Sequence, residues 1–343
     1  MEQLPCLLGM TLQQLKEVVA ALGLPAFTAK QLAEWIYGKR VSDFDAMTNL
    51  SKTARQRLAE TWRVGMEAPV DAVRSADGTV KYLFRAGDSH YIESVYIPEG
   101  DRATLCISSQ IGCKMNCRFC ATGRQGFSGQ LSVAEILNQV QCIDQPDSLT
   151  NVVFMGMGEP MDNLDNVLQA IEIMTASYGY GWSPKRITVS SVGLIPGIRR
   201  FLDSCSCHLA ISLHAPNDTV RATLIPAQKA YPAGELLDVL RQYDFSHQRR
   251  LSFEYTMFQG VNDTPADARE LARNLQGLDC HINLIPFHAV DGTGLRPTPP
   301  AEMERFMDLL NRLHFPTTIR RSRGQDIEAA CGLLSTKRME LNA

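Results

Sequence analysis

Three cysteines stand close together in one short stretch of the chain. They are Cys113, Cys117 and Cys120 in the segment CKMNCRFC, so that three residues and then two separate them. A cubane iron–sulfur cluster is usually held by four thiolates, and three would leave one iron open for a ligand. A structural zinc site would need a fourth cysteine or histidine close by, whereas the nearest histidines in sequence are His90 and His208. The spacing therefore predicts an iron–sulfur cluster with one open iron.

A second set of candidate residues lies at the ends of runs that we expect to form strands. A lone serine or histidine at such a position is more often structural, whereas glycine lets the backbone approach a ligand closely. Polar residues that recur at the ends of successive parallel strands favour a ligand site at the carboxyl edge of the sheet. The residues that share this placement are Gly156, Gly158, Glu159, Ser190, Ser212, Leu213 and His214, and Asn283 lies on the sixth expected strand.

The other cysteines need a separate interpretation. The chain has ten in all, and we expect thiols because disulfides are rare in a reducing compartment. Cys142, Cys205 and Cys280 stand beside apolar residues and are expected to be small core residues. Cys106, on an expected strand, would by itself be interpreted as a buried strand thiol.

Two different patterns precede the cysteine cluster. Residues 1 to about 65 have helical periodicity, with Thr28 as an expected helix cap and Gln31 at the capping-box position. This helical module carries Lys30, Lys39 and Arg40, which leaves a plain structural cap and a nucleic-acid-binding role equally open. Residues 66–101 alternate apolar and polar side chains between turn signals, and this pattern predicts a short antiparallel meander.

From residue 104 the pattern alternates strand and helix. We expect strands at 104–110, 151–156, 186–192, 208–215, 251–258 and 281–287, with a last strand in TTIRRS (317–322). The helix after the first strand should begin at a capping box of Ser132 and Glu135. Such alternation predicts an α/β fold with a parallel sheet, either barrel-like or doubly wound. The predicted domains are a helical domain (1–65), a β extension (66–101) and a core (102–343).

The composition limits the classes of function. The chain has 343 residues, 45% of them hydrophobic, and a net charge of −3, so contacts with a nucleic acid must come from local basic patches. No run approaches the roughly 18–20 apolar residues of a membrane span, and the N-terminus does not have the pattern of a signal peptide. We therefore expect a cytoplasmic protein with no membrane partner.

The cysteine motif and other segments resemble a known family. C-x3-C-x-F-C after a first strand resembles the motif of radical S-adenosylmethionine enzymes, and six segments are similar to the RlmN and Cfr family of RNA adenine methyltransferases. The resemblance implies a full or partial (β/α)6 barrel, and a [4Fe–4S] cluster whose open iron binds S-adenosylmethionine and splits it to a 5′-deoxyadenosyl radical. The segments run from about residue 93 to 332 and are LCISSQIGCKMNCRFCATG, FMGMGEPMDN, ITVSSVGLIP, LAISLHAPND, INLIPF and RGQDIEAACG.

The resemblance also implies roles for three further residues. Cys331 would be methylated by one S-adenosylmethionine, and a radical from a second molecule would then activate this methyl group to attack the adenine carbon. Cys106 would release the product by attacking the sulfur of Cys331, which leaves a transient disulfide. Glu93 matches the proposed acceptor of the adenine C2 proton. The residues from Gly158 to Asn283 described above match the family's S-adenosylmethionine positions.

By resemblance the substrates are 23S rRNA, at an adenine of the peptidyl transferase loop, and tRNA, at the adenine beside the anticodon. Gly158-Glu159-Pro160 favours methylation at C2, because the Cfr enzymes have GEA there and methylate C8. The C8 reaction and a metal-stabilised RNA-binding module without activity are the alternatives. We further expect a monomer and an electron donor such as flavodoxin. Basic residues expected to contact RNA are Arg118, Arg124, Arg320, Arg321, Arg323, Lys337 and Arg338.

Overall fold

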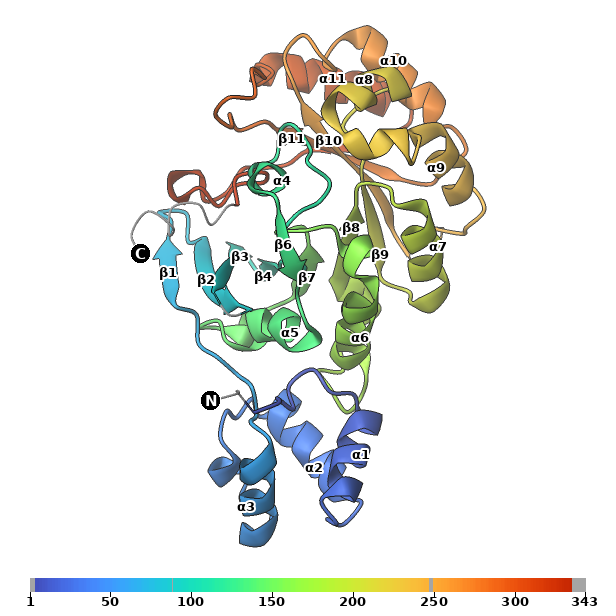
Figure 1. Cartoon of the computed structure of the whole chain (residues 1–343). Helices are drawn as coiled ribbons and strands as arrows, with labels where there is room; N and C mark the ends of the chain where they lie inside the picture. The colour runs from blue at the N-terminus through green and yellow to red at the C-terminus, as the bar shows by residue number, and fades with distance from the viewer. Residues whose placement is uncertain (1–3, 88, 247–248, 335–343) are drawn as a thin grey trace.

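The structure is a computed structural model that describes residues 4–87, 89–246 and 249–334 (Figure 1). A helical unit comes first, and its α1 begins at a capping box in which Thr11 and Gln14 each bond the other's backbone N–H. Residues 34–38 extend α2 by a π-helical turn. The helices of this unit are α1 (Leu12–Ala21), α2 (Thr28–Ala33) and α3 (Lys52–Thr61).

The expected cap of the second helix is wrong. Thr28 is the first residue of α2, and the residue before it, Phe27, makes no side-chain capping bond. Phe27 already has helical backbone angles (φ −66°, ψ −19°), so the turn starts before Thr28. Because Thr28 lies inside the helix with its side chain buried, its hydroxyl does not precede the first turn, which is where a capping side chain accepts a hydrogen bond.

One ten-stranded sheet forms the body of the molecule, and its first part is antiparallel. The strands pair in chain order, and in the last of these pairs Val95 lies opposite Cys106. This part carries the chain to the first parallel strand without a crossover helix. Its strands are β1 (Asp71–Arg74), β2 (Val80–Ala86), β3 (His90–Glu99) and β4 (Arg102–Cys106).

The second part of the sheet is parallel and starts at β4. Every expected strand is present, although most are shorter than the sequence suggested. The sheet has β1 and β12 at its edges, and residues from β3 to β12 line one cavity, so these strands curve around it as an open barrel. The predicted α/β fold is confirmed. The further parallel strands are β7 (Asn151–Phe154), β8 (Ile187–Ser191), β9 (His208–Ser212), β10 (Leu251–Met257), β11 (His281–Pro286) and β12 (Thr317–Ile319).

Helices between the parallel strands cover the outer side of the sheet (Figure 1). The first of them begins at the expected capping box of Ser132 and Glu135. Its apolar face, with Ile136, Leu137 and Val140, is buried in the main hydrophobic core. The helices are α5 (Val133–Gln141), α6 (Leu164–Thr175), α7 (Ile195–Ser204), α8 (Asp218–Leu224), α9 (Ala233–Leu240), α10 (Pro265–Asn274) and α11 (Pro300–Arg312).

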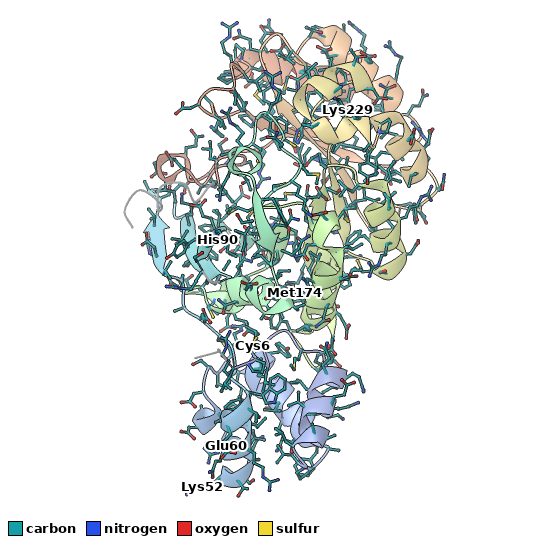
Figure 2. The ribbon with its side chains drawn as sticks, in the orientation of Figure 1. Cys6, Lys52, Glu60, His90, Met174 and Lys229 are labelled. Carbon is teal, nitrogen blue, oxygen red and sulfur yellow. The ribbon has the colours of Figure 1, made fainter. Side chains whose placement is uncertain are left out.

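The helical unit packs against the start of the parallel part of the sheet. The ring of Tyr37 lies 6.4 Å from that of Tyr178 and 6.2 Å from that of Tyr180, between ring centroids. The amide of Gln169 in α6 donates to the carbonyl of Gly9 at 2.7 Å. Figure 2 shows α3 at the end of the molecule opposite to Lys229. No helix among the described residues is long and apolar enough to cross a membrane.

Candidate active site

The three clustered cysteines lie in a loop between β5 (Gln110–Gly112) and the short helix α4 (Ala121–Gln125). The backbone N–H of Cys113 donates to the carbonyl of Gly126 at 2.7 Å, and that of Cys120 donates to Cys117 at 3.1 Å. These bonds close the loop on itself at both ends, and the three side chains line one wall of a cavity of about 160 Å³. The loop therefore presents all three thiols to one space.

These thiols fit an iron–sulfur cluster better than a single ion. Burial raises the pKa of Cys113 to about 12 and that of Cys117 well above its usual range, and the neighbouring sulfurs add to both shifts. The site therefore holds neutral thiols until a positive group binds. Within the described ranges no three Cys, His, Asp or Glu side chains are close enough to share one metal ion. In a cubane each thiolate binds a different iron, so three thiols that line one cavity suit the larger group.

The surroundings of the cluster loop are apolar. Phe119, Phe258 and Phe287 belong to a small hydrophobic cluster against which Cys117 and Cys120 pack. The ring centroids of Phe119 and Phe258 lie 5.4 Å apart. Such packing excludes water from the cavity wall and strengthens electrostatic interactions there.

Glycines after β7 allow the chain to pass close to the loop. Gly158 has φ +106°, and a Cβ atom there would lie 2.6 Å from the Cβ of Gln110. A Cβ on Gly156 would lie 2.7 Å from the carbonyl oxygen of Ile107. Both positions need glycine, one for its backbone angles and both for space. Gly156, Gly158 and Glu159 all line the smaller cavity, beside the cysteines.

Glu159 is a buried carboxylate between two strand ends. Its oxygens accept from the backbone N–H of Val192 at 2.8 Å and of Met161 at 3.1 Å. Burial raises the pKa of Glu159 to about 7, although these hydrogen bonds oppose the shift. The side chain ties the end of β8 to the turn after β7 and faces the cluster cavity.

The other predicted strand-end residues divide between two cavities. Ser190, Ser212 and His214 line the smaller one, where the two serine hydroxyls lie 3.3 Å apart. His214 accepts from the N–H of Thr256 at 3.0 Å, and burial followed by the charge of Arg221 lowers its pKa to about 3. This ring is therefore neutral at pH 7.

Asn283 and Leu213 lie away from the smaller cavity. Asn283 lines a larger cavity of about 690 Å³, where its amide donates to Glu254 at 2.9 Å. The side chain of Leu213 is buried and lines neither cavity, and its backbone N–H donates to the carbonyl of Glu254 at 3.1 Å. Leu213 thus contributes to the site through its backbone and not through its side chain.

The segment that carries Cys331 docks directly on the cluster loop. The N–H of Ala121 in α4 donates to the carbonyl of Gly332 at 2.8 Å. The hydroxyl of Thr122 donates to the carbonyl of Leu334 at 2.7 Å. Cys331 consequently lines both cavities, together with Cys113, Cys117 and Cys120 in the smaller one.

The turn between β1 and β2 holds the same segment from the other side. Asp326 accepts from the hydroxyl of Ser75 at 2.6 Å and from the N–H of Ala76 at 3.2 Å. Gly324, with φ +61°, donates its N–H to Asp77 at 3.0 Å. The antiparallel extension is therefore part of the scaffold that positions Cys331.

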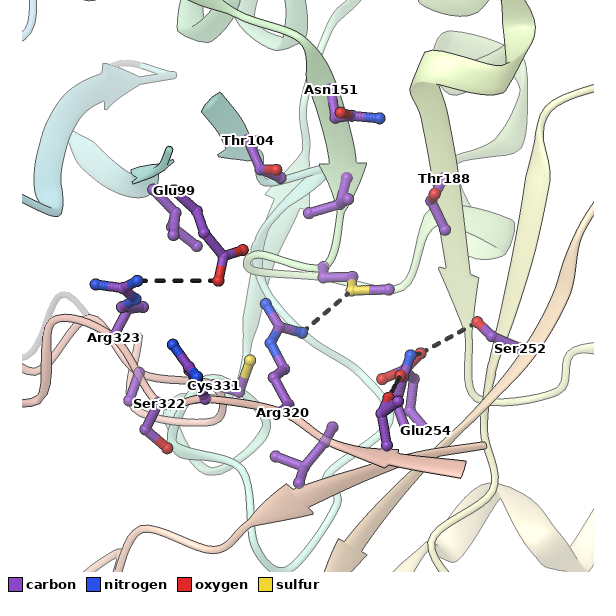
Figure 3. Close-up of a pocket in the computed structure, with 18 of the residues that line it drawn as sticks. Glu99, Thr104, Asn151, Thr188, Ser252, Glu254, Arg320, Ser322, Arg323 and Cys331 are labelled. Carbon is purple, nitrogen blue, oxygen red and sulfur yellow. Dashed lines mark hydrogen bonds and ion pairs between the residues drawn. The ribbon is translucent and has the colours of Figure 1, made fainter. Parts of the chain in front are cut away.

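Cys106 is the buried last residue of β4, and it is near enough to Cys331 for their charges to interact. Burial raises the pKa of Cys106 to about 12, with a further contribution from Cys331 and an opposing one from Arg320. The guanidinium of Arg320 reaches the sulfur of Met155 at 3.8 Å (Figure 3), and the neighbouring Cys331 raises its pKa. One cation thus lies close to both sulfurs.

Glu93 is separate from this group. Its side chain is buried on β3 and forms an ion pair with Lys81 at 3.0 Å. It lines neither cavity, although its carbonyl accepts from the hydroxyl of Ser108 at 2.6 Å, two residues after Cys106. Its predicted role as a base stays a prediction.

Sequence reasoning missed two buried charged residues. Glu254 on β10 lines both cavities and accepts from Ser252 at 3.2 Å (Figure 3). A carboxylate within the apolar run LSFEYTMF was a signal for it. Arg221 is fully buried and donates to the carbonyls of Leu213, at 3.2 Å, and Val192. No sequence pattern pointed to this arginine, because only the packing of α8 places it at the strand ends.

The basic residues expected at the mouth have varied surroundings. Arg320 lines both cavities, and Arg321 and Arg323 line the larger one, where Arg323 lies 3.9 Å from Glu99 (Figure 3). Arg118 donates to the carbonyl of Thr223 at 3.2 Å. Arg124 is exposed on α4. Lys337 and Arg338 lie outside the described residues.

Comparisons with known proteins cover nearly the whole chain. A family model described as the ribosomal RNA large subunit methyltransferase N-terminal domain matches residues 6–64, and a radical SAM superfamily model matches residues 107–275. A probable dual-specificity RNA methyltransferase RlmN of Bacteroides thetaiotaomicron is 56% identical over 98% of this chain and 97% of its own length. Its namesake in Bacteroides fragilis is 57% identical over 97% of each chain. The crystal structure of a radical SAM methyltransferase from Sphaerobacter thermophilus matches with a TM-score of 0.91 and 41% identity, over 96% of this chain and 99% of that one.

Proposed function

This chain belongs to the RlmN family of radical S-adenosylmethionine RNA methyltransferases, whose superfamily uses a [4Fe–4S] cluster and S-adenosylmethionine, and we propose that it methylates C2 of adenine in 23S rRNA and in tRNA. The observation that carries this proposal is the docking of the Cys331 segment on the cluster loop, through Ala121 and Thr122. A reactive sulfur beside a radical-generating site is what methyl delivery to an unreactive carbon requires.

Cys113, Cys117 and Cys120 would hold the cluster, and the residues at the ends of β7, β8 and β9 would hold S-adenosylmethionine. When bound, the two groups supply a methyl cation equivalent and a radical that can remove a hydrogen atom from an unactivated carbon. Adenine C2 lies between two ring nitrogens and is electron-poor, so it does not attack a sulfonium. The apolar surroundings of the cavity would protect a radical from water.

Cys331 would carry the methyl group to the base. Its thiolate would attack the methyl carbon of S-adenosylmethionine, so a sulfur–carbon bond forms at Cys331 as the sulfonium–methyl bond breaks and S-adenosylhomocysteine leaves. Arg320, whose pKa the neighbouring Cys331 raises, supplies the positive charge that stabilises such a thiolate. Loss of a hydrogen atom from the S-methyl group then lets the carbon add to adenine, which joins RNA to the protein covalently.

Cys106 would free the product. Its thiolate attacks the sulfur of Cys331, a disulfide bond forms, and the electron pair of the broken sulfur–carbon bond passes to the carbon, which takes up a proton to become methyl. Arg320 favours the Cys106 thiolate against the effect of burial. Glu93 is proposed as the acceptor of the original C2 proton, and the one electron left over after radical addition would pass to the bound cluster.

Other points stay proposals as well. Methylation at C8 is the second candidate reaction, and Gly158-Glu159-Pro160 favours C2 over it. A flavodoxin-type electron donor, a monomeric state, a cytoplasmic location and the division into 1–65, 66–101 and 102–343 extend the same hypothesis. An RNA-binding module without activity is not retained, because the family is one of methyltransferases.

The test is reaction of the cluster-loaded enzyme with rRNA fragments and tRNA in the presence of methyl-labelled S-adenosylmethionine. Nucleoside analysis should find 2-methyladenosine from both RNAs, and Cys331→Ala should give none. Label at C8 would favour the alternative reaction, and label in only one RNA would limit the proposed substrates. Unlabelled RNA with fully loaded enzyme would contradict the proposal.

A further inference from the structure

Cations and histidines gather at the amino edge of the parallel sheet, opposite to the proposed active site. Each lies at or just before the first residue of a different strand. Because parallel strands begin at the same edge, these side chains surround one opening of the barrel, and we call them the basic ring. The basic ring consists of Arg102 at β4, Lys185 before β8, His208 at β9, Arg250 before β10 and His281 at β11.

The basic ring shares a cavity with the proposed methyl carrier. All five side chains line the cavity of about 690 Å³ that also contains Cys331 and Arg320. Glu254, which lines both cavities, is four residues after Arg250 in the chain, and four extended residues span about 13 Å. A nucleic acid whose base reaches Cys331 has its backbone in or beside this cavity, within a few nucleotides of the basic ring.

The cations of the basic ring have no acidic partner among the described residues. No ion pair within these ranges includes Arg102, Lys185 or Arg250. The carboxylates in the same cavity are engaged elsewhere: Glu99 with Arg323 and Glu254 with two neutral side chains.

An adjoining cavity of about 390 Å³ is also lined by more cations than carboxylates. It contains Lys185, Arg249 and Arg250, with Asp279 as the one acidic residue among its described lining. Like charges held close together repel each other, so their placement without acidic partners favours binding of an anion.

The two histidines contribute hydrogen-bonding groups at pH 7. Burial, followed by the charges of Arg250 and Lys185, lowers the pKa of His208. Burial and Arg250 lower the pKa of His281 to about 4. In both cases the neighbouring cations add to the effect of burial. Hydroxyl and amide groups of Asn151 and Ser252 line the same cavity, and such groups together with Arg and Lys are the usual partners of phosphate oxygens.

We propose that the basic ring is a phosphate-binding site, and that in the working enzyme it binds backbone phosphates of the RNA close to the target adenine. The choice of RNA as the source rests on the proposed function, whereas the phosphate chemistry rests on the basic ring alone. Specificity for adenine would come from the carboxyl edge, because phosphate contacts position a strand without reading its sequence.

The experiment measures binding by the cluster-loaded full chain. The probe is a stem-loop RNA with an unpaired adenine, titrated by fluorescence anisotropy at several salt concentrations. The ring variant is Lys185→Gln with Arg250→Gln, and Lys185→Gln alone serves if the double variant loses its fold. The matched control removes two exposed cations elsewhere, Lys229→Gln on the outer surface (Figure 2) and Arg269→Gln on α10. Calorimetry with inorganic pyrophosphate tests free phosphate on the same proteins.

The ring variant should bind RNA about tenfold more weakly, and the slope of log K against log salt should fall by roughly 1.4, at about 0.7 for each lost phosphate contact to a single strand. The control should change affinity less than twofold. Unchanged RNA binding with loss of pyrophosphate binding would support a phosphate site for a free ligand instead of RNA. Unchanged binding of both probes would overturn the proposal. Nucleoside analysis of the wild type judges the proposed methylation separately, so the two can fail independently.

Discussion

The two edges of the parallel sheet carry groups of opposite character. At the carboxyl edge, thiols, glycines and the buried Glu159 pack against aromatic rings, and backbone hydrogen bonds fix their positions. At the amino edge, Arg102, Lys185 and Arg250 are exposed and form no ion pair with another described residue. The carboxyl edge is buried and closely packed, whereas the cations at the amino edge are exposed to solvent and repel one another.

The difference shows that one sheet can meet two physical demands. Bond making needs reacting atoms to be held to within fractions of an ångström, and closely packed strand ends around a small cavity provide this. Attraction of a polyanion needs only positive charges close to its phosphates, and solvent-exposed Arg and Lys side chains provide them. Substitutions at the carboxyl edge should therefore cause large and specific losses, whereas those at the amino edge should cause graded, salt-dependent ones.

The largest expected effect is at a cluster cysteine. Cys117→Ala should remove bound iron and sulfide and abolish methylation, because a site that already leaves one iron open cannot lose another ligand. Iron and sulfide analysis, the visible spectrum and label transfer to RNA measure this. Cys280→Ala, which removes a buried thiol elsewhere, should retain the bound iron and sulfide, the visible spectrum and label transfer. Full activity of the Cys117 variant would show that the cluster is held by other residues.

Cys106→Ala should retain the cluster and stop the reaction after the radical step. Without the second thiolate, the thioether between Cys331 and the adenine has no route to break, so a covalent protein–RNA adduct should accumulate. A denaturing gel should show a slow band that ribonuclease removes, and Cys207→Ala should show none. Normal turnover, or loss of activity with no adduct, would place the resolving role elsewhere.

Gly158→Ala should weaken S-adenosylmethionine binding at least tenfold. A non-glycine residue at φ +106° carries strain of about 1–3 kcal/mol, and the added Cβ would lie 2.6 Å from Gln110. Gly260→Ala is the matched control, because that glycine has φ +71° with no atom within 4 Å of the added Cβ. Equilibrium binding and thermal unfolding separate the two effects. Equal affinities in both variants would show that close approach at Gly158 does not matter.

Asp326→Ala should lower kcat several-fold and leave the affinity for S-adenosylmethionine unchanged. The substitution removes the bonds from Ser75 and Ala76 that hold the Cys331 segment, but touches no group at the strand ends. Asp308→Ala on α11 is an exposed control. Steady-state kinetics measure kcat, and single-turnover kinetics with methyl-loaded enzyme show whether the step that uses Cys331 is the one slowed. A change in affinity with kcat preserved would contradict the role of this contact as a tether.

The smallest expected effect is a pH dependence of stability. The pKa of His214 falls from 6.5 to about 3 on folding, so below pH 6.5 the unfolded chain binds a proton that the folded chain does not. The free energy of unfolding should therefore decrease as the pH is lowered from 6.5 towards 3, by up to about 1.4 kcal/mol per pH unit. Urea unfolding at pH 7.5 and at pH 5.5 measures this difference in stability. His214→Asn should reduce the difference, and His90→Asn, an exposed control, should not. Equal differences in wild type and His214→Asn would show that this ring does not cause the dependence.

The sequence predicted features that depend on local pattern. The capping box at Ser132 and Glu135, the strand–helix alternation and the cysteine spacing all involve residues near one another in the chain. The cap expected at Thr28 was wrong, because Phe27 already has helical backbone angles and Thr28 therefore lies inside the helix. Strand ends were overestimated for a similar reason, since apolar runs continue into buried loops.

The sequence could predict which residues belong to the candidate site, but not which of them contact one another. Resemblance supplied Cys331 and Cys106. The electrostatic effect of Arg320 on Cys106 and the hydrogen bond from Gly324 to Asp77 depend on pairs that are far apart in the chain. The basic ring had no signal at all. Its members are single basic residues at the starts of separate strands, and only the sheet order brings them to one edge.

The docking of the Cys331 segment has a consequence for how the molecule folds. Its contacts join very distant partners: Ser75 and Asp326 are 251 residues apart, and Thr122 and Leu334 are 212 apart. The entropy lost in closing such loops delays these contacts until the strands between them have assembled. Few hydrogen bonds hold the segment, so it can also detach without global unfolding. Maturation of the site is then a separate kinetic step after the barrel forms, and amide exchange in this segment should be faster than in the strands that it covers.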